Sequence, residues 1–189
     1  MIISEFSLNQ NTIFKKIQDN LSIITCIEFS PCGLFLATSS DDRSLHYYKV
    51  ITQYELQLVN LFKYEATNSL TSLSISSCGS YLALGGFDKL ILFFDINQHS
   101  KNFGKTFLSH ELESRITSIS TCPYSCHLTV GCWDNSLIIN KLDLVKPIKK
   151  IETIFNKRIH TESVIFTTYS KYGDYLATAG DDKTAIIFC

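Results

Sequence analysis

The chain has 189 residues, of which 45% are hydrophobic, 12% aromatic and 19% charged, and its 17 basic and 18 acidic side chains give a formal charge of -1. This composition supplies enough apolar surface for a packed core in one domain, and it excludes a disordered, polyanionic or polybasic segment. Because the charges balance, direct binding to nucleic acid or to an acidic membrane surface is disfavoured.

The N-terminal stretch carries an early acid, Glu5, with no basic region and no small-residue cleavage site, so it does not resemble a signal peptide. No apolar run approaches the roughly 18 residues of a transmembrane helix. The seven cysteines are odd in number and lack the paired spacing of a disulfide framework. We therefore expect an intracellular protein, cytoplasmic or nuclear, that has no membrane partner.

The first clear elements are three short apolar runs rich in β-forming residues, which predict strands over Ile23–Phe29, Leu34–Thr38 and Ser44–Lys49. The sequence Ser-Pro-Cys-Gly at 30–33 separates the first two runs. Pro fixes φ in such a turn, and Gly adopts a left-handed conformation without a steric penalty. These runs are too short for helices, so the unit predicts antiparallel hairpins.

The same pattern recurs at 71–96, 116–142 and 163–189, and fixed-period similarity of this kind is the signature of a repeat protein. Further apolar stretches at 56–64, 105–108 and 148–155 lie between the units and predict a fourth strand for each. One aspartate per unit marks the register, with spacings of 46, 46 and 48 residues, just above the roughly 40–45 residues of a propeller blade. These anchor aspartates are Asp42, Asp88, Asp134 and Asp182.

The units resemble WD repeats, the sequence class that builds β-propellers. The features that carry the resemblance are the turn at 30–33, the Leu-Ala-Thr segments at 36–38 and 176–178, and the anchor aspartates. It implies an all-β fold of about four blades, each with four antiparallel strands, in one domain over residues 1–189. Its repeat units cover approximately 12–50, 51–96, 97–142 and 143–189.

His160 and Thr184 stand around Asp182 as in the hydrogen-bonded set that stitches one WD blade together. His110, Asp134 and Ser136 form a second, looser copy. A His near an Asp and a hydroxyl also invites a hydrolase interpretation. We favour a structural role, because the trio recurs at the repeat spacing and no separate oxyanion feature is visible. No catalytic residue is expected, and the chain is not expected to be an enzyme.

The resemblance also implies that partners dock on the face formed by the turns before the anchors and by the loops that enter the innermost strands. On that face Trp133, the only tryptophan, combines with Phe87 and Arg115, and aromatic and Arg side chains dominate interface energetics. Asp41 and Asp181 occupy the equivalent turn positions of the first and fourth units. We expect these five residues to bind a protein or peptide, although Trp133 could instead cover the neighbouring blade.

Two other interpretations, a role with RNA and a metal site, have weaker support. An accessory role in an RNA-processing or RNA-modifying complex would use the basic clusters Lys146–Lys150 and Lys157-Arg158, which are modest and typical of solvated loops. A zinc site would use Cys122, Cys126 and Cys132 beside His127. Small apolar side chains in or beside strands are the favoured interpretation of these cysteines. We therefore expect no metal and no cofactor.

WD-repeat propellers commonly close with seven blades, and this chain has four units, so we expect a partial propeller whose end blades expose strand edges and apolar flanks. Three arrangements follow, in order of preference: a piece of a longer propeller, a ring completed by another chain or a second copy, and a strained four-bladed ring. Strand-like segments at 1–8 and 12–17 could pair with the last unit or with a partner.

A subfamily resemblance is also present. The third unit, with GGFDKLILFFDIN before it, is similar to blades of the spindle-checkpoint and mRNA-export propellers that bind GLEBS-type peptides. The Trp-Asp-Asn segment at 133–135 also occurs in propellers attached to BEACH domains. These similarities do not fix a pathway.

Overall fold

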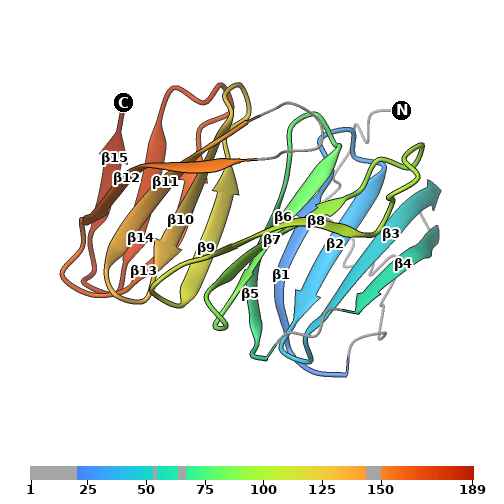
Figure 1. The fold of residues 1–189 in the computed structure, drawn as a ribbon, viewed down its shortest axis with the longest axis horizontal. Helices are drawn as coiled ribbons and strands as arrows, with labels where there is room; N and C mark the ends of the chain where they lie inside the picture. The colour runs from blue at the N-terminus through green and yellow to red at the C-terminus, as the bar shows by residue number, and fades with distance from the viewer. Residues whose placement is uncertain (1–20, 53–54, 64–66, 144–149) are drawn as a thin grey trace, which may run out of the picture.

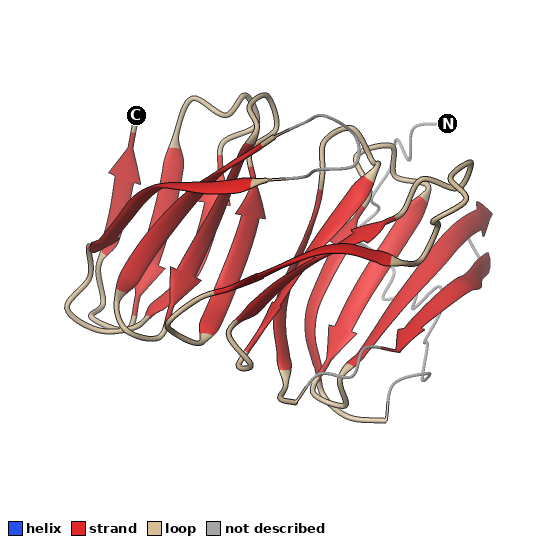
Figure 2. Ribbon diagram, in the orientation of Figure 1, coloured by secondary structure: helices blue, strands red, loops and turns tan. Residues whose placement is uncertain are grey.

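A computed structural model describes residues 21–52, 55–63, 67–143 and 150–189. These residues form antiparallel β-sheets joined by loops, with no helix among them (Figures 1 and 2). The segments at 1–8 and 12–17 and most of the Lys146–Lys150 cluster lie outside the described residues. No helix long and apolar enough to cross a membrane occurs in the described part of the chain.

Four sheets follow one another along the chain, and each pairs its strands in sequence order, so that every sheet is a meander. The first sheet contains β1 (Ile24–Phe29), β2 (Phe35–Ser40), β3 (Ser44–Thr52) and β4 (Glu55–Lys63). The second contains β5 (Leu70–Ile75), β6 (Tyr81–Gly86), β7 (Leu90–Asp95) and β8 (Thr106–Glu111). The third contains β9 (Ile116–Thr121), β10 (His127–Cys132), β11 (Ser136–Leu142) and β12 (Ile151–Arg158). The fourth contains β13 (Val164–Tyr169), β14 (Leu176–Gly180) and β15 (Ala185–Phe188).

This architecture confirms the predicted all-β propeller, with the sheets as successive blades 1 to 4. The three strands predicted for the first unit are present as β1, β2 and β3. The outer strands predicted between units are present as β4, β8 and β12, although β12 begins at Ile151 rather than at Ile148. Blade 4 has three described strands where four were expected for each unit.

The anchor aspartates shape the hairpins between the second and third strands. Each anchor's Oδ1 accepts the backbone N–H of the residue two positions later, at 2.9 Å for Ser44 and 3.0 Å for Thr184. This Asx-type bond supports a left-handed conformation at the residue between, which other side chains rarely adopt. The intervening residues Arg43, Lys89, Asn135 and Lys183 all have φ between 66° and 74°.

Neighbouring blades pack through their innermost strands: β1 contacts β5, β5 contacts β9, and β9 contacts β13. One apolar cluster fills the space between blades 1 and 2, with Leu45, Tyr47 and Phe94 among its buried members. A second cluster between blades 2 and 3 includes Ile119 and Val130. Burial of these side chains provides most of the driving force that holds one blade against the next.

Hydrogen bonds reinforce each of these joints in the same way. A side chain on an inner strand bonds to the backbone of the next blade's inner strand. The Ser72 and Ser74 hydroxyls accept the N–H groups of Ile119 and Thr121 at 2.9 and 3.1 Å. The bonds at the other two joints run from the Thr167 N–H to Ser118 Oγ at 2.8 Å and from the Ile75 N–H to Glu28 Oε2 at 3.1 Å.

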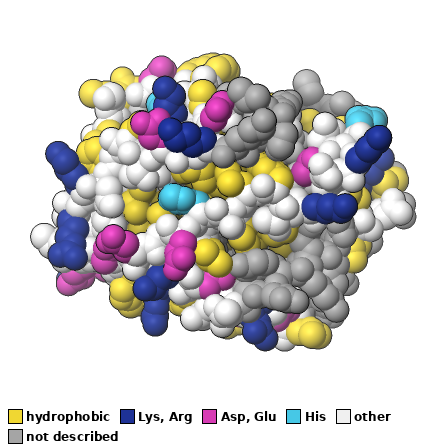
Figure 3. Space-filling model, in the orientation of Figure 1, with side chains coloured by type: hydrophobic (Ala, Val, Ile, Leu, Met, Phe, Trp, Pro, Cys, Tyr) yellow, Lys and Arg dark blue, Asp and Glu magenta, His cyan; other side chains and the backbone are white. Residues whose placement is uncertain are grey.

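No comparable contact joins β1 to β13 among the described residues, so the four blades form an open arc (Figure 1). Both ends of the arc expose apolar side chains. On blade 1, Ile27 and Phe29 are 60% and 59% exposed, and on blade 4, Phe166 and Ile187 are 59% and 72% exposed. The arc therefore has the exposed flanks that were predicted for a partial propeller. On the side drawn in Figure 3, Lys and Arg side chains are interspersed with Asp and Glu.

Candidate docking face

The hairpins that carry the anchors meet the loops that enter the inner strands, all at one end of the blades. In every blade, the residue before the anchor donates its N–H to the carbonyl oxygen of the residue that precedes the inner strand, which fixes hairpin and loop side by side. These four bonds are Asp41 to Ile23 at 2.9 Å, Phe87 to Ser69 at 3.0 Å, Trp133 to Arg115 at 3.0 Å, and Asp181 to Ser163 at 2.9 Å.

Three of the residues predicted to bind a partner lie together at the joint between blades 2 and 3. The rings of Phe87 and Trp133 meet edge to face, with centroids 6.0 Å apart and planes at 81°. The Arg115 guanidinium carbon lies 5.6 Å from the centre of the Phe87 ring, within cation–π range. Trp133 is 51% exposed and Arg115 is exposed, whereas Phe87 is half-buried between them. We call these three residues the aromatic cluster.

The backbone beneath the aromatic cluster is held by blade 4. Ser163 Oγ donates to the Trp133 carbonyl oxygen at 3.0 Å, so the hairpin that carries the indole is tied to both neighbouring blades. Asp41 and Asp181 are exposed on blades 1 and 4, and among the described residues neither forms an ion pair with Arg115. The structure thus brings three of the five predicted residues into direct contact and places the other two on flanking blades of the same face.

The structural set predicted around Asp182 is present with full hydrogen bonding. His160 Nδ1 lies 2.9 Å from Asp182 Oδ2 in the turn after β14, its Nε2 lies 2.9 Å from Thr178 Oγ1 of β14, and the residue is buried. The Thr184 hydroxyl donates to Asp182 Oδ1 at 2.7 Å. Together with the Thr161 N–H, these donors hold the pKa of Asp182 far below its usual value, and the Thr184 hydroxyl has the largest effect.

The set predicted around Asp134 is incomplete. Ser136 Oγ donates to Asp134 Oδ1 at 2.6 Å, as expected. Among the described residues, no hydrogen bond joins His110 to Asp134, because His110 lies within β8 of the preceding blade, opposite Ile91. His110 instead lines a cavity of about 150 Å³ together with Asp134 and Ser136.

The remaining anchors have no histidine. Asp42 accepts the Leu21 N–H at 2.7 Å. Burial opposes its ionisation, but the Ser44 hydroxyl and this N–H together lower the pKa of Asp42. For Asp88, burial raises the pKa of the carboxyl, and its Oδ2 atom has no hydrogen-bond partner among the described residues.

The cysteines that raised the zinc alternative do not converge on one point. Cys122 follows β9, Cys126 precedes β10, and Cys132 ends β10, at the opposite end of that strand from Cys126. Burial raises the pKa of the Cys132 thiol to about 12, which disfavours the thiolate that binds a metal. No group of three potential metal-binding side chains occurs among the described residues.

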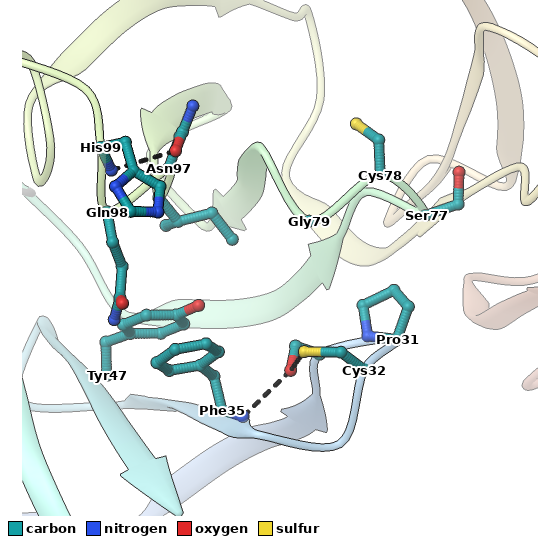
Figure 4. Close-up of a pocket in the computed structure, with 12 residues that line it drawn as sticks. Pro31, Cys32, Phe35, Tyr47, Ser77, Cys78, Gly79, Asn97, Gln98 and His99 are labelled. Atoms are coloured by element: carbon teal, nitrogen blue, oxygen red, sulfur yellow. Dashed lines mark hydrogen bonds between the residues drawn. The ribbon is translucent and has the colours of Figure 1, made fainter.

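Sequence reasoning missed a groove at the opposite end of blades 1 and 2 (Figure 4). It has a volume of about 270 Å³ and lies between the turns that contain Cys32 and Cys78 and the loop that contains His99. The rings of Phe35 and Tyr47 form its floor and stack with centroids 5.3 Å apart. Its lining comes from four separate segments, so no local sequence pattern identifies it.

Comparisons with known proteins agree with this architecture. The family model described as "WD domain, G-beta repeat" matches residues 12–49, 58–95, 101–139 and 151–189, and the chain therefore belongs to the WD-repeat family. Its repeats are offset from the blades by one strand, since the second match begins in β4 of blade 1 and ends with β7 of blade 2. Comparison with curated protein sequences yields no match.

A chain in the solved structure titled "Crystal Structure of Mitotic Checkpoint Complex" has the same fold, with a TM-score of 0.76 at 19% sequence identity. The similarity covers 90% of this chain and 50% of that chain, so this chain spans half the length of the propeller it resembles. At this identity, the likeness shows the fold alone.

Proposed function

We propose that this protein is a non-catalytic scaffold that docks a peptide or a protein domain on the face carrying the aromatic cluster. WD-repeat proteins generally serve as protein-interaction scaffolds. The mechanism is surface docking on a rigid face and needs no cofactor. Phe87, Arg115 and Trp133 supply the central contacts, and Asp41 and Asp181 supply polar contacts on either side.

The observation that carries this proposal is the exposure of Trp133 over a preorganised base. The indole is 51% exposed although it packs against Phe87, so a large apolar surface remains for a partner. The Trp133 backbone bonds to Arg115 of its own blade and to Ser163 of blade 4. A partner would therefore lose little free energy to ordering the site, which favours binding.

A library of random peptides displayed on phage, selected on the purified chain, tests this proposal. We expect enriched sequences whose binding to the chain is lost when Trp133 is replaced by alanine. Enriched peptides that bind the Trp133→Ala variant as tightly as the unchanged chain would refute the assignment of the face.

The alternative role in RNA processing is tested on the same protein by fluorescence anisotropy with single-stranded and hairpin RNA. Lys157 and Arg158 end β12 and are exposed, but Lys157 Nζ lies over the Phe155 ring, 5.8 Å from its centroid, within cation–π range. We expect no salt-dependent binding. An affinity that falls steeply with added salt, as phosphate contacts produce, would favour the RNA role instead.

We further propose that additional blades complete the arc in the working protein, either from the remainder of a longer chain or from a second chain or copy. Each joint within the arc covers apolar side chains of the kind that Ile27 and Phe166 expose at the ends. Light scattering after size exclusion on residues 1–189 tests this. Self-association or aggregation is expected, whereas a stable monomer with protected terminal strands would show that four blades suffice.

A further inference from the structure

A cavity of about 350 Å³ lies on the inner strands, near the turns at the opposite end from the aromatic cluster. All four blades line it, through Glu28 of β1, Ser74 of β5, Ser120 of β9 and Thr168 of β13. These four residues occupy equivalent positions in the repeats, and three of them carry a hydroxyl. Glu28 differs from the other three, because it has a carboxyl where the other blades have small hydroxyl side chains.

The Glu28 carboxyl is partly buried, and its bonds are to neutral groups. It accepts the Ile75 N–H at 3.1 Å and a hydrogen bond from the Ser74 side chain. Burial is the dominant influence and raises the pKa of Glu28 to about 7, against these two hydrogen bonds, which lower it. A carboxyl in this position is ready to ionise if a cation enters and supplies the missing charge.

The other titratable groups near Glu28 do not supply that charge. Cys26 lies on the same strand, and its thiol contacts the Leu73 carbonyl oxygen at 3.8 Å. Tyr169 lines the cavity, and its hydroxyl is bonded to Thr129 Oγ1 at 2.5 Å. The described lining contains no Lys, Arg or His. The cavity is therefore acidic and rich in hydrogen-bond acceptors, with no internal cation.

We propose that this cavity binds the ammonium or guanidinium group of a Lys or Arg side chain presented by a protein partner, with Glu28 as its counter-ion. The hydroxyl of Ser120, which makes no hydrogen bond within the described residues, lies on the same wall. The volume is near the lower limit of about 300 Å³ for small-molecule pockets, which suits one long side chain. The Phe29 and Pro31 side chains at the rim can pack against the aliphatic stem.

This site differs from the aromatic cluster in position and in chemistry. It lies toward the hairpins between the first and second strands, whereas the cluster lies at the opposite ends of the blades. An experiment can therefore refute the proposed cation site without refuting the proposed docking face, and the reverse also holds. A partner that used both sites would contact opposite ends of the blades.

The test uses two small probes that differ only in charge, N-acetyl-arginine methylamide and its neutral isostere N-acetyl-citrulline methylamide. Two-dimensional NMR of the full chain would follow the Ile75 amide, which is bonded to Glu28. We expect saturable shifts with the arginine probe at millimolar concentration and none with the citrulline probe. Equal binding of the two probes, or no shift with either, would overturn the proposal.

The pH dependence provides a second readout on the unchanged protein. Because only the ionised carboxylate pairs with the cation, the dissociation constant should fall about tenfold between pH 6 and pH 8. Glu28→Gln retains an acceptor for the Ile75 N–H but should abolish both the binding and its pH dependence. Glu152→Gln, an exposed position on β12, is the matched control and should change neither. Retained binding in Glu28→Gln, or a flat pH profile in the unchanged protein, would contradict the assignment.

Discussion

The indole of Trp133 meets the ring of Phe87 at 81°, with centroids 6.0 Å apart, although the two residues occupy equivalent hairpins of different blades. The contact joins blade 2 to blade 3 at the proposed docking face and leaves half of the indole exposed. The same pair therefore contributes to the joint between the blades and to the surface that we propose for a partner. Part of the effect of any substitution at Trp133 will be structural, and binding must be measured beside stability.

The His160→Ala substitution is expected to lower the free energy of unfolding by about 1–3 kcal/mol, because it removes a buried ring bonded to Asp182 and Thr178. Urea unfolding measures this change. His110→Ala is the matched control within the chain, since His110 makes no hydrogen bond to its own anchor, and it should have a much smaller effect. Equal losses in the two variants would contradict the structural role assigned to His160.

Low pH should weaken the hydrogen-bonded set around Asp182. The pKa of Asp182 is lower in the folded protein than in the unfolded chain, so its contribution to stability is complete above the ordinary value near 3.8 and is lost as the pH falls below it. Asp182→Asn removes this contribution. The difference in unfolding free energy between the original protein and Asp182→Asn should therefore shrink as the pH falls from about 4 to 2. A difference that stays constant over this range would argue against the shifted pKa.

Glu28 should have the opposite pH dependence. Burial raises its pKa from 4.5 to about 7, so between these values the folded protein holds a proton that the unfolded chain has released, and stability falls as the pH rises. In the absence of a bound cation, Glu28→Gln should be more stable than the original protein at pH 8, by on the order of 2–3 kcal/mol, and nearly equal to it at pH 4. Thermal unfolding at the two pH values checks this. A variant that is less stable at pH 8 would show that the carboxylate is already well compensated.

Gly85 tests the packing between blades 2 and 3. A Cβ atom at this position would lie 2.5 Å from Ile119 Cδ1 and 2.7 Å from Ile116 Cγ2, so Gly85→Ala should cost about 1–3 kcal/mol of stability through overpacking. Adding Ile119→Val removes the nearest atom and should restore part of the loss. Urea unfolding that shows no loss in the single variant, or no recovery in the double variant, would mean that the joint accommodates the methyl group.

Much of each blade could be predicted from the sequence, because the information is local. The strand–turn–strand pattern identifies β1, β2 and β3, and the spacing of His160, Asp182 and Thr184 identifies their hydrogen-bonded set. His110 shows the limit of this approach: its approximate spacing suggested a second set, but it falls within β8.

The features that could not be predicted depend on how one blade meets the next. The contact of Phe87 with Arg115 and the convergence of Glu28 with Ser74 both join different blades. The angle between blades is set by close packing, as at Gly85 against Ile119, and no repeat spacing encodes it. Repeat position predicted that Trp133 lies in a hairpin beside the loop that enters an inner strand, but only the three-dimensional arrangement shows which neighbours surround it.

The most direct test of the docking face compares the affinity of one phage-selected peptide for three proteins: the unchanged chain, Trp133→Ala and Tyr124→Ala. Tyr124 is the matched control, an aromatic residue 74% exposed in the β9–β10 turn at the opposite end of blade 3. Circular dichroism would confirm that all three are folded at the temperature used. We predict that Trp133→Ala weakens binding at least tenfold, as expected for an interface hot spot, and that Tyr124→Ala leaves it within about twofold. A peptide that loses affinity with Tyr124→Ala and keeps it with Trp133→Ala would contradict the proposed docking face.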